Sequence, residues 1–180
     1  RRVLFRSSGA SDRPSAALLR KQLADDARLD AVGHALLRAA APGCVERTTR
    51  AGFRMTNLAA FSHRWQPYAR QLGYTDTVVV LSVAPGSGAE RAGLLAGDRL
   101  IGLGNVPLPV GAGGIEAVGA RIRATDERAP TIPVTVLRER RSLTFTLPLD
   151  KSCAVSVMSW RQDAPDAWSD GRTIARSEEH

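Results

Sequence analysis

The sequence predicts an α+β fold, on three observations. Residues 15–41 carry apolar side chains at every third or fourth position, which is the pattern of an amphipathic helix. Residues 77–83 form a run of mainly β-branched residues that stops at a Pro-Gly pair, as a strand followed by a turn does. Residues 132–147 alternate apolar and polar side chains on both sides of a charged segment, which predicts a β-hairpin.

The elements between these three segments are shorter. The apolar spacing over residues 45–75 predicts a short strand that includes Phe53 and Met55, followed by a helix around Pro67. Residues 99–103 form a second buried strand. A loop with two prolines and three glycines follows, and residues 115–122 then carry apolar side chains at helical spacing.

A capping box lies between the two central strands. Ser87 and Glu90 are three residues apart, so the Ser87 hydroxyl can accept from the amide of residue 90 while the carboxylate of Glu90 reaches back. The helix that they begin is short, because Gly93 stands where a left-handed C-cap is needed. Gly97-Asp98 then predicts a tight turn into the next strand.

Composition excludes several classes of protein. The chain has 180 residues, of which 43% are hydrophobic and 24% charged, a mixture typical of one folded domain with an extension. The longest relevant apolar run, residues 78–81, is far too short for a membrane span. The formal charge is +7, but the cations are 23 Arg and 2 Lys scattered along the chain and aromatic residues are only 5%, so we expect no nucleic-acid partner.

The two ends resemble translated sequencing adaptor. Residues 176–180 and residues 2–7 correspond to the same adaptor in opposite orientations. We therefore expect residues 1–14 to be adaptor-derived and linker, and residues 176–180 to be adaptor-derived. On this interpretation the chain is an internal piece of a longer gene, and Glu178-Glu179-His180 carries no metal chemistry.

The cysteines and histidines do not form a metal motif. Cys44 and Cys153 are far apart in the sequence, and neither His34 nor His63 is followed by a potential ligand three or four residues later. We therefore predict no metal site. The residues alone leave two alternatives for the cysteines, which are a disulfide in an oxidising compartment and two buried free thiols.

Residues 83–101 read VAPGSGAERAGLLAGDRLI and closely resemble the signature of bacterial PDZ domains, in which a Pro-Gly-Ser turn leads to AGL, then GD and an apolar strand. The resemblance covers about residues 71–149 and implies a PDZ-like, small, partly open β-barrel with two helices, preceded by an N-terminal helical segment. PDZ domains bind an extended peptide, often a C-terminus, as a strand added to a sheet edge.

The resemblance implies a peptide site in two parts. The loop that holds the peptide carboxylate often reads GLGF in this family, and its counterpart here is QLGY, so we expect Leu72, Gly73, Tyr74 and Thr75 to bind peptide. Val118 is expected to face the groove from the second helix. One departure stands out, because only one strand fits between Tyr74 and the Pro-Gly turn, where many PDZ domains have two. The alternative is a module that only packs against a neighbouring domain.

The segment after the hairpin has a resemblance of its own. Residues 153–174, with the turn DAWSDG at 166–171, look like the opening of the catalytic domain of HExxH zinc metallopeptidases related to the CAAX prenyl protease. Some bacterial envelope proteins of that family resemble the whole arrangement, with a cysteine on each side of the PDZ domain. This likeness favours a Cys44–Cys153 disulfide and a periplasmic or cell-envelope location.

The expected function follows from these resemblances. We expect a PDZ-type peptide- or protein-binding regulatory module of a secreted or periplasmic zinc metalloendopeptidase, with residues 15–70 as the N-terminal helical segment, 71–150 as the PDZ domain and 151–175 as the start of the peptidase domain. The chain contains no HExxH and no G-x-S-x-G motif, so we expect no catalytic residue and no cofactor in it, with zinc in the parent enzyme.

The expected partners are an extended peptide, a protein C-terminus or the adjacent peptidase domain. Two other classes remain open, a non-enzymatic PDZ adaptor or scaffold and the PDZ domain of a trypsin-like or membrane-embedded protease.

Overall fold

The main sheet of the computed structural model is antiparallel and is built from the middle of the chain. The model describes residues 13–125, 130–160, 167–169 and 173–177. The path of hydrogen-bonded strands is β2-β3-β4-β6-β7, and β5 pairs with β4 beside it. The strand bounds are β2 (Phe53–Thr56), β3 (Val79–Val83), β4 (Arg99–Leu103), β5 (Val106–Pro107), β6 (Thr131–Arg138) and β7 (Arg141–Pro148). The sheet and its helices confirm the predicted α+β class.

The predicted hairpin is confirmed as β6 and β7. Its register pairs Ile132 with Leu147 and Val134 with Phe145, so the alternating apolar side chains lie on one face. Val134 and Leu147 are completely buried there. Glu139 and Arg140, at the tip, both have positive φ, which is the backbone that a two-residue hairpin turn needs.

The short capped helix also forms as predicted. It is α3 (Gly88–Arg91), and the Ser87 Oγ accepts from the amide of Glu90 at 3.2 Å while a carboxylate oxygen of Glu90 accepts from the amide of Gly86 at 2.7 Å. Gly93 has a φ of 82° and ends the helix. Leu94 then folds back into the core, where it is only 1% exposed.

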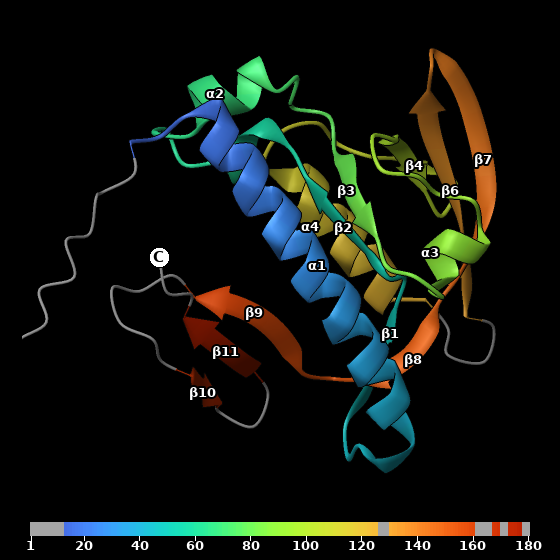
Figure 1. The fold of residues 1–180 in the computed structure, drawn as a ribbon. Coiled ribbons are helices and arrows are strands. Elements are labelled where there is room, and N and C mark those ends of the chain that lie inside the picture. The colour runs from blue at the N-terminus through green and yellow to red at the C-terminus, as the bar shows by residue number, and fades with distance from the viewer. Residues whose placement is uncertain (1–12, 126–129, 161–166, 170–172, 178–180) are drawn as a thin grey trace, which may run out of the picture.

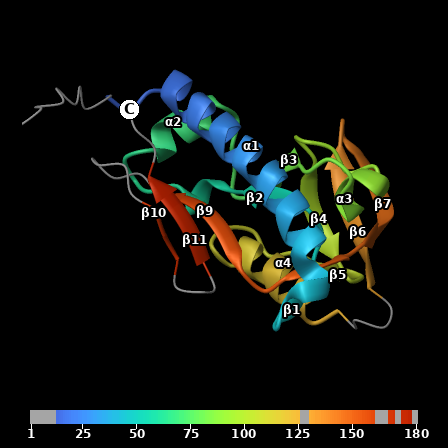
Figure 2. The ribbon, with the colours of Figure 1, turned by 60° about the horizontal axis from the view of Figure 1, so that its bottom comes forward.

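Two helices lie on opposite faces of β2 and β3 (Figures 1 and 2). α1 (Ala16–Ala40) covers the outer face, and Ser15 caps it by accepting from the amide of Leu18. α4 (Gly113–Arg123) covers the inner face, where the largest cluster of buried apolar residues lies. That cluster includes Val78, Val80, Leu94, Leu100, Leu103, Val118, Val134, Val136 and Leu147.

The strand that seemed to be missing before the Pro-Gly turn is supplied by β2. It pairs antiparallel with β3, with Phe53 opposite Val83 and Thr56 opposite Val79. The chain then passes through η2 (Leu58–Ala60) and α2 (Gln66–Gln71) before it returns as β3. β2 belongs to the segment 15–70, which the sequence indicated as a mainly helical unit, but its hydrogen bonds place it in the main sheet.

A second, two-stranded sheet holds the N-terminal helix to the end of the hairpin. β1 (Arg47–Arg50) pairs with β8 (Asp150–Cys153), and Arg47 is opposite Cys153. A disulfide joins Cys44, which follows η1 (Ala41–Gly43), to Cys153 across a Cα–Cα distance of 5.6 Å. The bridge spans a sequence separation of 109 residues.

The C-terminal strands form a third small sheet. β9 (Ser156–Trp160) is parallel to β11 (Thr173–Ser177), which is antiparallel to β10 (Ala167–Ser169). β9 follows directly from β8 and runs against α1. Three residues of the predicted DAWSDG turn, at 166, 170 and 171, lie outside the described residues, as do most residues of the two expected adaptor segments.

The described ranges contain neither a membrane-spanning helix nor a cluster of metal-binding side chains. In the ranges given above, no helix combines the length and apolar character that a bilayer crossing requires. The same ranges contain no group of three or more His, Cys, Asp or Glu side chains placed to hold a metal ion.

The disulfide should account for a large part of the stability. In the chain-entropy model, removing a disulfide that closes a loop of this length lowers the free energy of unfolding by about 4–5 kcal/mol, because the conformational entropy of the unfolded chain increases. We therefore expect a double variant, Cys44→Ser with Cys153→Ser, to unfold at a much lower urea concentration than the oxidised protein. Mass spectrometry without reductant should show the two cysteine peptides linked. Equal urea midpoints for the variant and the oxidised protein would contradict this.

Candidate functional site

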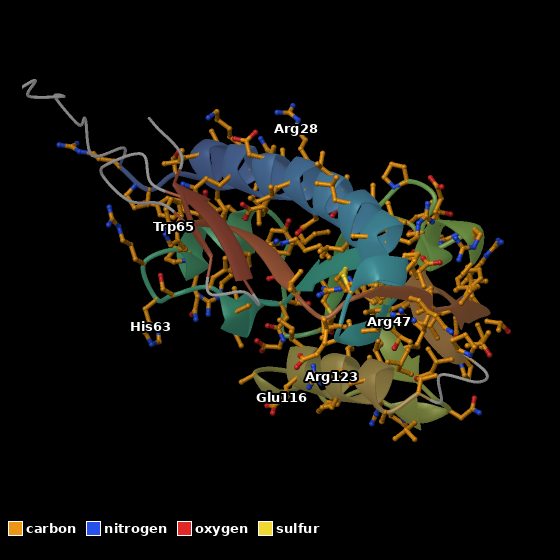
Figure 3. All side chains as sticks on the ribbon, turned by 90° about the horizontal axis from the view of Figure 1, so that it is seen from below. Arg28, Arg47, His63, Trp65, Glu116 and Arg123 are labelled. Carbon is orange, nitrogen blue, oxygen red and sulfur yellow. A yellow bond between two sulfur atoms is a disulfide. The ribbon has the colours of Figure 1, made fainter. Side chains whose placement is uncertain are left out.

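A cavity of about 570 Å³ opens at the N-terminal end of β2. We call it the turn cavity. Residues 48–54 line it, and they comprise the end of β1, the turn at Ala51 and Gly52, and the start of β2. Its other walls include His34 of α1 and Ile122 and Arg123 of α4. Figure 3 views this end from below, with Arg123 labelled on α4 and the disulfide visible as the yellow bond above it.

β2 borders the cavity as an edge strand. It is the last strand of the main sheet, and β3 is its hydrogen-bonded neighbour on one side. Its other side carries no hydrogen-bonded strand among the described residues, and β9 crosses the region between α1 and α4 in the second ribbon view (Figure 2). An edge strand carries unpaired backbone groups on its free side, and these can pair with another extended chain.

The turn before β2 has an unusual backbone arrangement. Its carbonyls face the body of the protein, since Ala51 O accepts from the amide of Ala89 at 2.9 Å and Gly52 O accepts from the amide of Ala84 at 2.8 Å. Within the described residues, the amides of Ala51 and Gly52 donate no hydrogen bond. Successive amides left without an acceptor are a common way to bind an anion.

Glycine is required at position 52 by both conformation and space. Its φ is 78°, which side-chain-bearing residues rarely adopt. A Cβ there would overlap Ser87 Cβ and lie 2.8 Å from the Cε1 atom of His34. The turn can therefore sit directly on α3 and α1.

Arg50 adds a positive charge to the turn cavity. One terminal nitrogen of its guanidinium donates to the carbonyl of Val155, but its buried Nε has no partner among the described residues. Burial lowers the pKa of Arg50 from its ordinary value, because loss of hydration disfavours the charged form. The unpaired N–H and the lost hydration both favour an anionic ligand.

An ion-pair cluster supports the turn from below. Asp150 accepts from the Gly88 amide at 2.8 Å and from Arg91 Nη2 at 2.6 Å. His34 Nε2 lies 3.5 Å from the same carboxylate. Burial lowers the pKa of His34, and the nearby charge of Asp150 partly opposes this shift.

A second ion-pair cluster fixes α1 on the outer face of β2. Arg54 pairs with Asp30 at 2.9 Å and with Asp26 at 3.5 Å. Burial raises the pKa of Asp30 above its ordinary value, while the charge and hydrogen bonds of Arg54 oppose the shift. Because Arg54 and Asp30 both line the turn cavity, α1 is a fixed wall of it.

The structure separates the peptide-binding residues that the sequence indicated. Leu72, Gly73, Tyr74 and Thr75 line a different hollow of about 290 Å³, together with Gly97 and Arg99. Gly73, with a φ of 86°, follows the end of α2, and the Tyr74 ring packs on Phe61 with centroids 5.4 Å apart. These residues do not line the turn cavity.

Val118 does not face a groove. It lies on α4 as predicted, but it is completely buried in the main core. Gly119, Ile122 and Arg123 are the residues of that helix that reach the turn cavity. The apolar stripe of α4, which includes Val118, therefore points to the core, and the adjacent positions border the cavity.

Residues 50–53 were not predicted from the sequence as part of a peptide-binding site. A signal was present, since Gly52 directly precedes the alternating pair Phe53 and Met55, which is how a glycine turn leads into a strand. Leu72, Gly73, Tyr74 and Thr75 were expected to bind peptide because QLGY resembles the GLGF loop. The structure places η2 and α2 between β2 and β3, so QLGY does not precede the edge strand.

Gly52→Ala should destabilise the protein by about 2–4 kcal/mol, because the new methyl group meets Ser87 and His34 and the φ is strained. Gly73→Ala is the matched control, since it has the same kind of φ with open space around it and should cost about 1 kcal/mol. Urea unfolding of the three proteins measures both values. Equal losses in the two variants would show that the turn does not pack as described.

Comparison with known proteins identifies the middle of the chain. Residues 79–134 match the family model described as the PDZ domain, which confirms the predicted PDZ-like fold. No curated protein matches the chain.

Several solved structures are similar to the chain. The HtrA3 PDZ domain, bound to a phage-derived ligand (FGRWV), is 20% identical with a TM-score of 0.44, over 59% of this chain and 88% of that one. The HtrA-type protease AlgW with a decapeptide is 21% identical with a TM-score of 0.44, over 58% of this chain and 30% of that one. A serine endoprotease from Yersinia pestis is 23% identical with a TM-score of 0.36, over 41% of this chain and 25% of that one.

The similar structures share only part of their length with this chain, or are isolated PDZ domains. This chain spans less than a third of the AlgW and Yersinia pestis chains. The proteins named above are PDZ domains and HtrA-type or serine proteases, and none of the three is a metallopeptidase.

Proposed function

We propose that this protein is a PDZ-type module that captures the C-terminus of an extended peptide or protein at the free edge of β2. The observation that carries the proposal is the turn at Arg50–Gly52, where two backbone amides and the Arg50 Nε lack acceptors beside an open edge strand. Strand addition and capture of a carboxylate by backbone amides are established ways to bind a peptide.

The position of the turn sets the direction of the peptide. The amides that would hold the carboxylate lie at the N-terminal end of β2, so the last residue of the ligand must lie there too. The ligand then runs antiparallel to β2, in the same sense as the β2–β3 pair. About three or four of its residues can pair with a strand as short as Phe53–Thr56.

Alternate side chains of the ligand would meet different walls. Side chains on one face of an added strand point toward α4, where Ile122 is half-buried and apolar. Those on the other face point toward α1, where Asp30 and Arg54 form their ion pair. An apolar last residue with its carboxylate beside Arg50 fits the first wall.

The finer part of the proposal concerns the parent protein. We assign the module to a secreted or periplasmic zinc metalloendopeptidase as a regulatory domain, on the resemblance of residues 153–174 and the cysteines that flank the PDZ domain. Zinc would belong to the parent's catalytic domain, and no residue of the described ranges is assigned to it. The Cys44–Cys153 disulfide supports an oxidising, extracytoplasmic compartment.

One alternative has its own support. Arg50 donates to the carbonyl of Val155, just before β9, and β9 runs against α1. A following domain attached through β9 could therefore pack beside the edge of β2, and the module would then position that domain. A non-enzymatic adaptor would bind peptide without it. Extending the gene sequence beyond Ile174 separates these readings, because an HExxH helix supports the metallopeptidase.

Peptide capture is tested with a C-terminal peptide library displayed on phage and synthetic copies of its best binder. We expect the free acid to bind at least about tenfold more tightly than the C-terminal amide, because a charge-assisted hydrogen bond contributes about 1.5–3 kcal/mol. Arg50→Gln should remove most of that preference. Fluorescence polarisation with the labelled peptide measures both effects.

The matched control for this experiment is Thr75→Ala, which changes the separate hollow and should leave the affinity unchanged. Circular dichroism establishes that both variants are folded. Equal binding of acid and amide, or loss of binding in Thr75→Ala alone, would refute a carboxylate site at the turn.

A further inference from the structure

His34 lies outside the segment that matches the PDZ family, yet it forms part of the turn cavity. It is on α1, it is only 7% exposed, and its ring lies against the backbone of Gly52. The same glycine provides one of the two amides left without an acceptor. A helix from the N-terminal extension therefore places a titratable group directly behind the proposed carboxylate site.

The hydrogen bonding of His34 is incomplete. Its Nε2 atom is buried and has no hydrogen-bond partner among the described residues. The nearest acceptor is Asp150 Oδ2 at 3.5 Å, and that carboxylate already accepts from the Gly88 amide and from Arg91. The buried ring is thus held without a strong hydrogen bond, and the charges around it influence its protonation.

The charges facing His34 come from four elements. Asp150 comes from β8 and lies closest, and Arg91 of α3 pairs with it. Arg50 of β1 and Arg38 of α1 oppose protonation by their positive charge. Asp30, one turn before His34 on α1, faces the same cavity and is paired with Arg54. Three cations and one paired carboxylate thus surround the ring, and Asp30 faces the cavity beside it.

We propose that His34 takes up a proton when a peptide carboxylate occupies the turn cavity, so that peptide capture tightens as the pH falls. The inference rests on the proposed function, because it requires a carboxylate beside Arg50. His34 acts as a positioning residue that supports Gly52 from behind. The ligand class it favours is a free C-terminus, in preference to an amide or an internal segment.

The direction of the effect follows from charge and linkage. A bound carboxylate offsets the positive charge of Arg50 and Arg38, so the protonated ring is less disfavoured in the complex than in the free protein. The pKa of His34 is lowered by burial in the free protein and rises on binding. A group whose pKa rises on binding gives tighter binding as the pH falls through the interval between its two values.

Asp30 is the one other group in this cavity whose pKa is shifted in a direction that could mimic the effect. Its pKa is raised by burial, and its protonation would remove a negative charge near the ligand. Asp30→Asn removes that contribution and leaves His34 in place. The terminal carboxyl of a peptide has a pKa of about 3.5 and stays charged over the range of the test.

The experiment measures the affinity of the library-selected peptide, as free acid and as amide, at about pH 5.5 and about pH 7.5. We expect the free acid to bind about three- to tenfold more tightly at the lower pH, since uptake of one proton gives at most tenfold per pH unit. The amide should show no such change. His34→Gln should abolish the pH dependence and keep the preference for acid over amide.

Two control variants and a direct readout complete the test. His63→Gln changes an exposed histidine and should keep the full pH dependence, as should Asp30→Asn. NMR titration of the His34 Cε1 proton in the wild-type protein, with and without peptide, should show a higher pKa in the complex. This readout needs no variant to fold.

The outcomes separate the two proposals. Equal affinity at both pH values, an unchanged His34 titration, or a pH dependence that persists in His34→Gln would overturn the proposed role of His34. None of these results would overturn peptide capture. If neither the acid nor the amide binds at any pH, the peptide-capture function itself is wrong. Retained acid preference without pH dependence leaves that function standing and refutes the proton linkage.

Discussion

The docking of the turn at Ala51 and Gly52 onto α3 is the constraint on which the rest of the arrangement depends. The two carbonyls bind the amides of Ala89 and Ala84, and Gly52 leaves no room for a Cβ beside Ser87. These contacts set the register in which β2 meets β3. The amides of the same two residues have no recorded acceptor among the described residues, so one turn both joins the sheet to α3 and forms the proposed site.

The N-terminal helix does more than precede the PDZ-like unit. α1 contacts it through two successive turns, by the ion pair of Asp30 with Arg54 and by His34, which lies 3.5 Å from Asp150. The β1–β8 pair and the disulfide tie the following segment to the end of the hairpin. Burial of charged groups without full pairing is costly, and the structure concentrates it at Arg50 and His34. That concentration supports the choice of the turn cavity as the candidate site.

The difference between the peptide site expected from the sequence and the site proposed from the structure has a definite cause. Gly73 is the glycine that precedes β3 most closely in the sequence, so the sequence favours it as the glycine of the peptide-binding loop. In the structure, η2 and α2 lie between β2 and β3, and the edge strand β2 precedes both of them in the chain. The glycine next to this edge strand is Gly52. The expectation that Val118 faces a groove has a related origin. Helical spacing shows that residues of α4 share a face, but it does not say whether that face meets the core or a groove.

Local physics explains why much of the fold was predictable. The hairpin alternation, the Ser87–Glu90 capping box and the Gly93 helix end are interactions between residues close in sequence, so the sequence alone determined β3, α3, β4 and the β6–β7 hairpin. Only the tertiary structure decided which strand forms the edge, which glycine carries free amides, and that His34 lies behind them. Those features depend on contacts between residues tens of positions apart, such as His34 with Asp150, which no local pattern encodes.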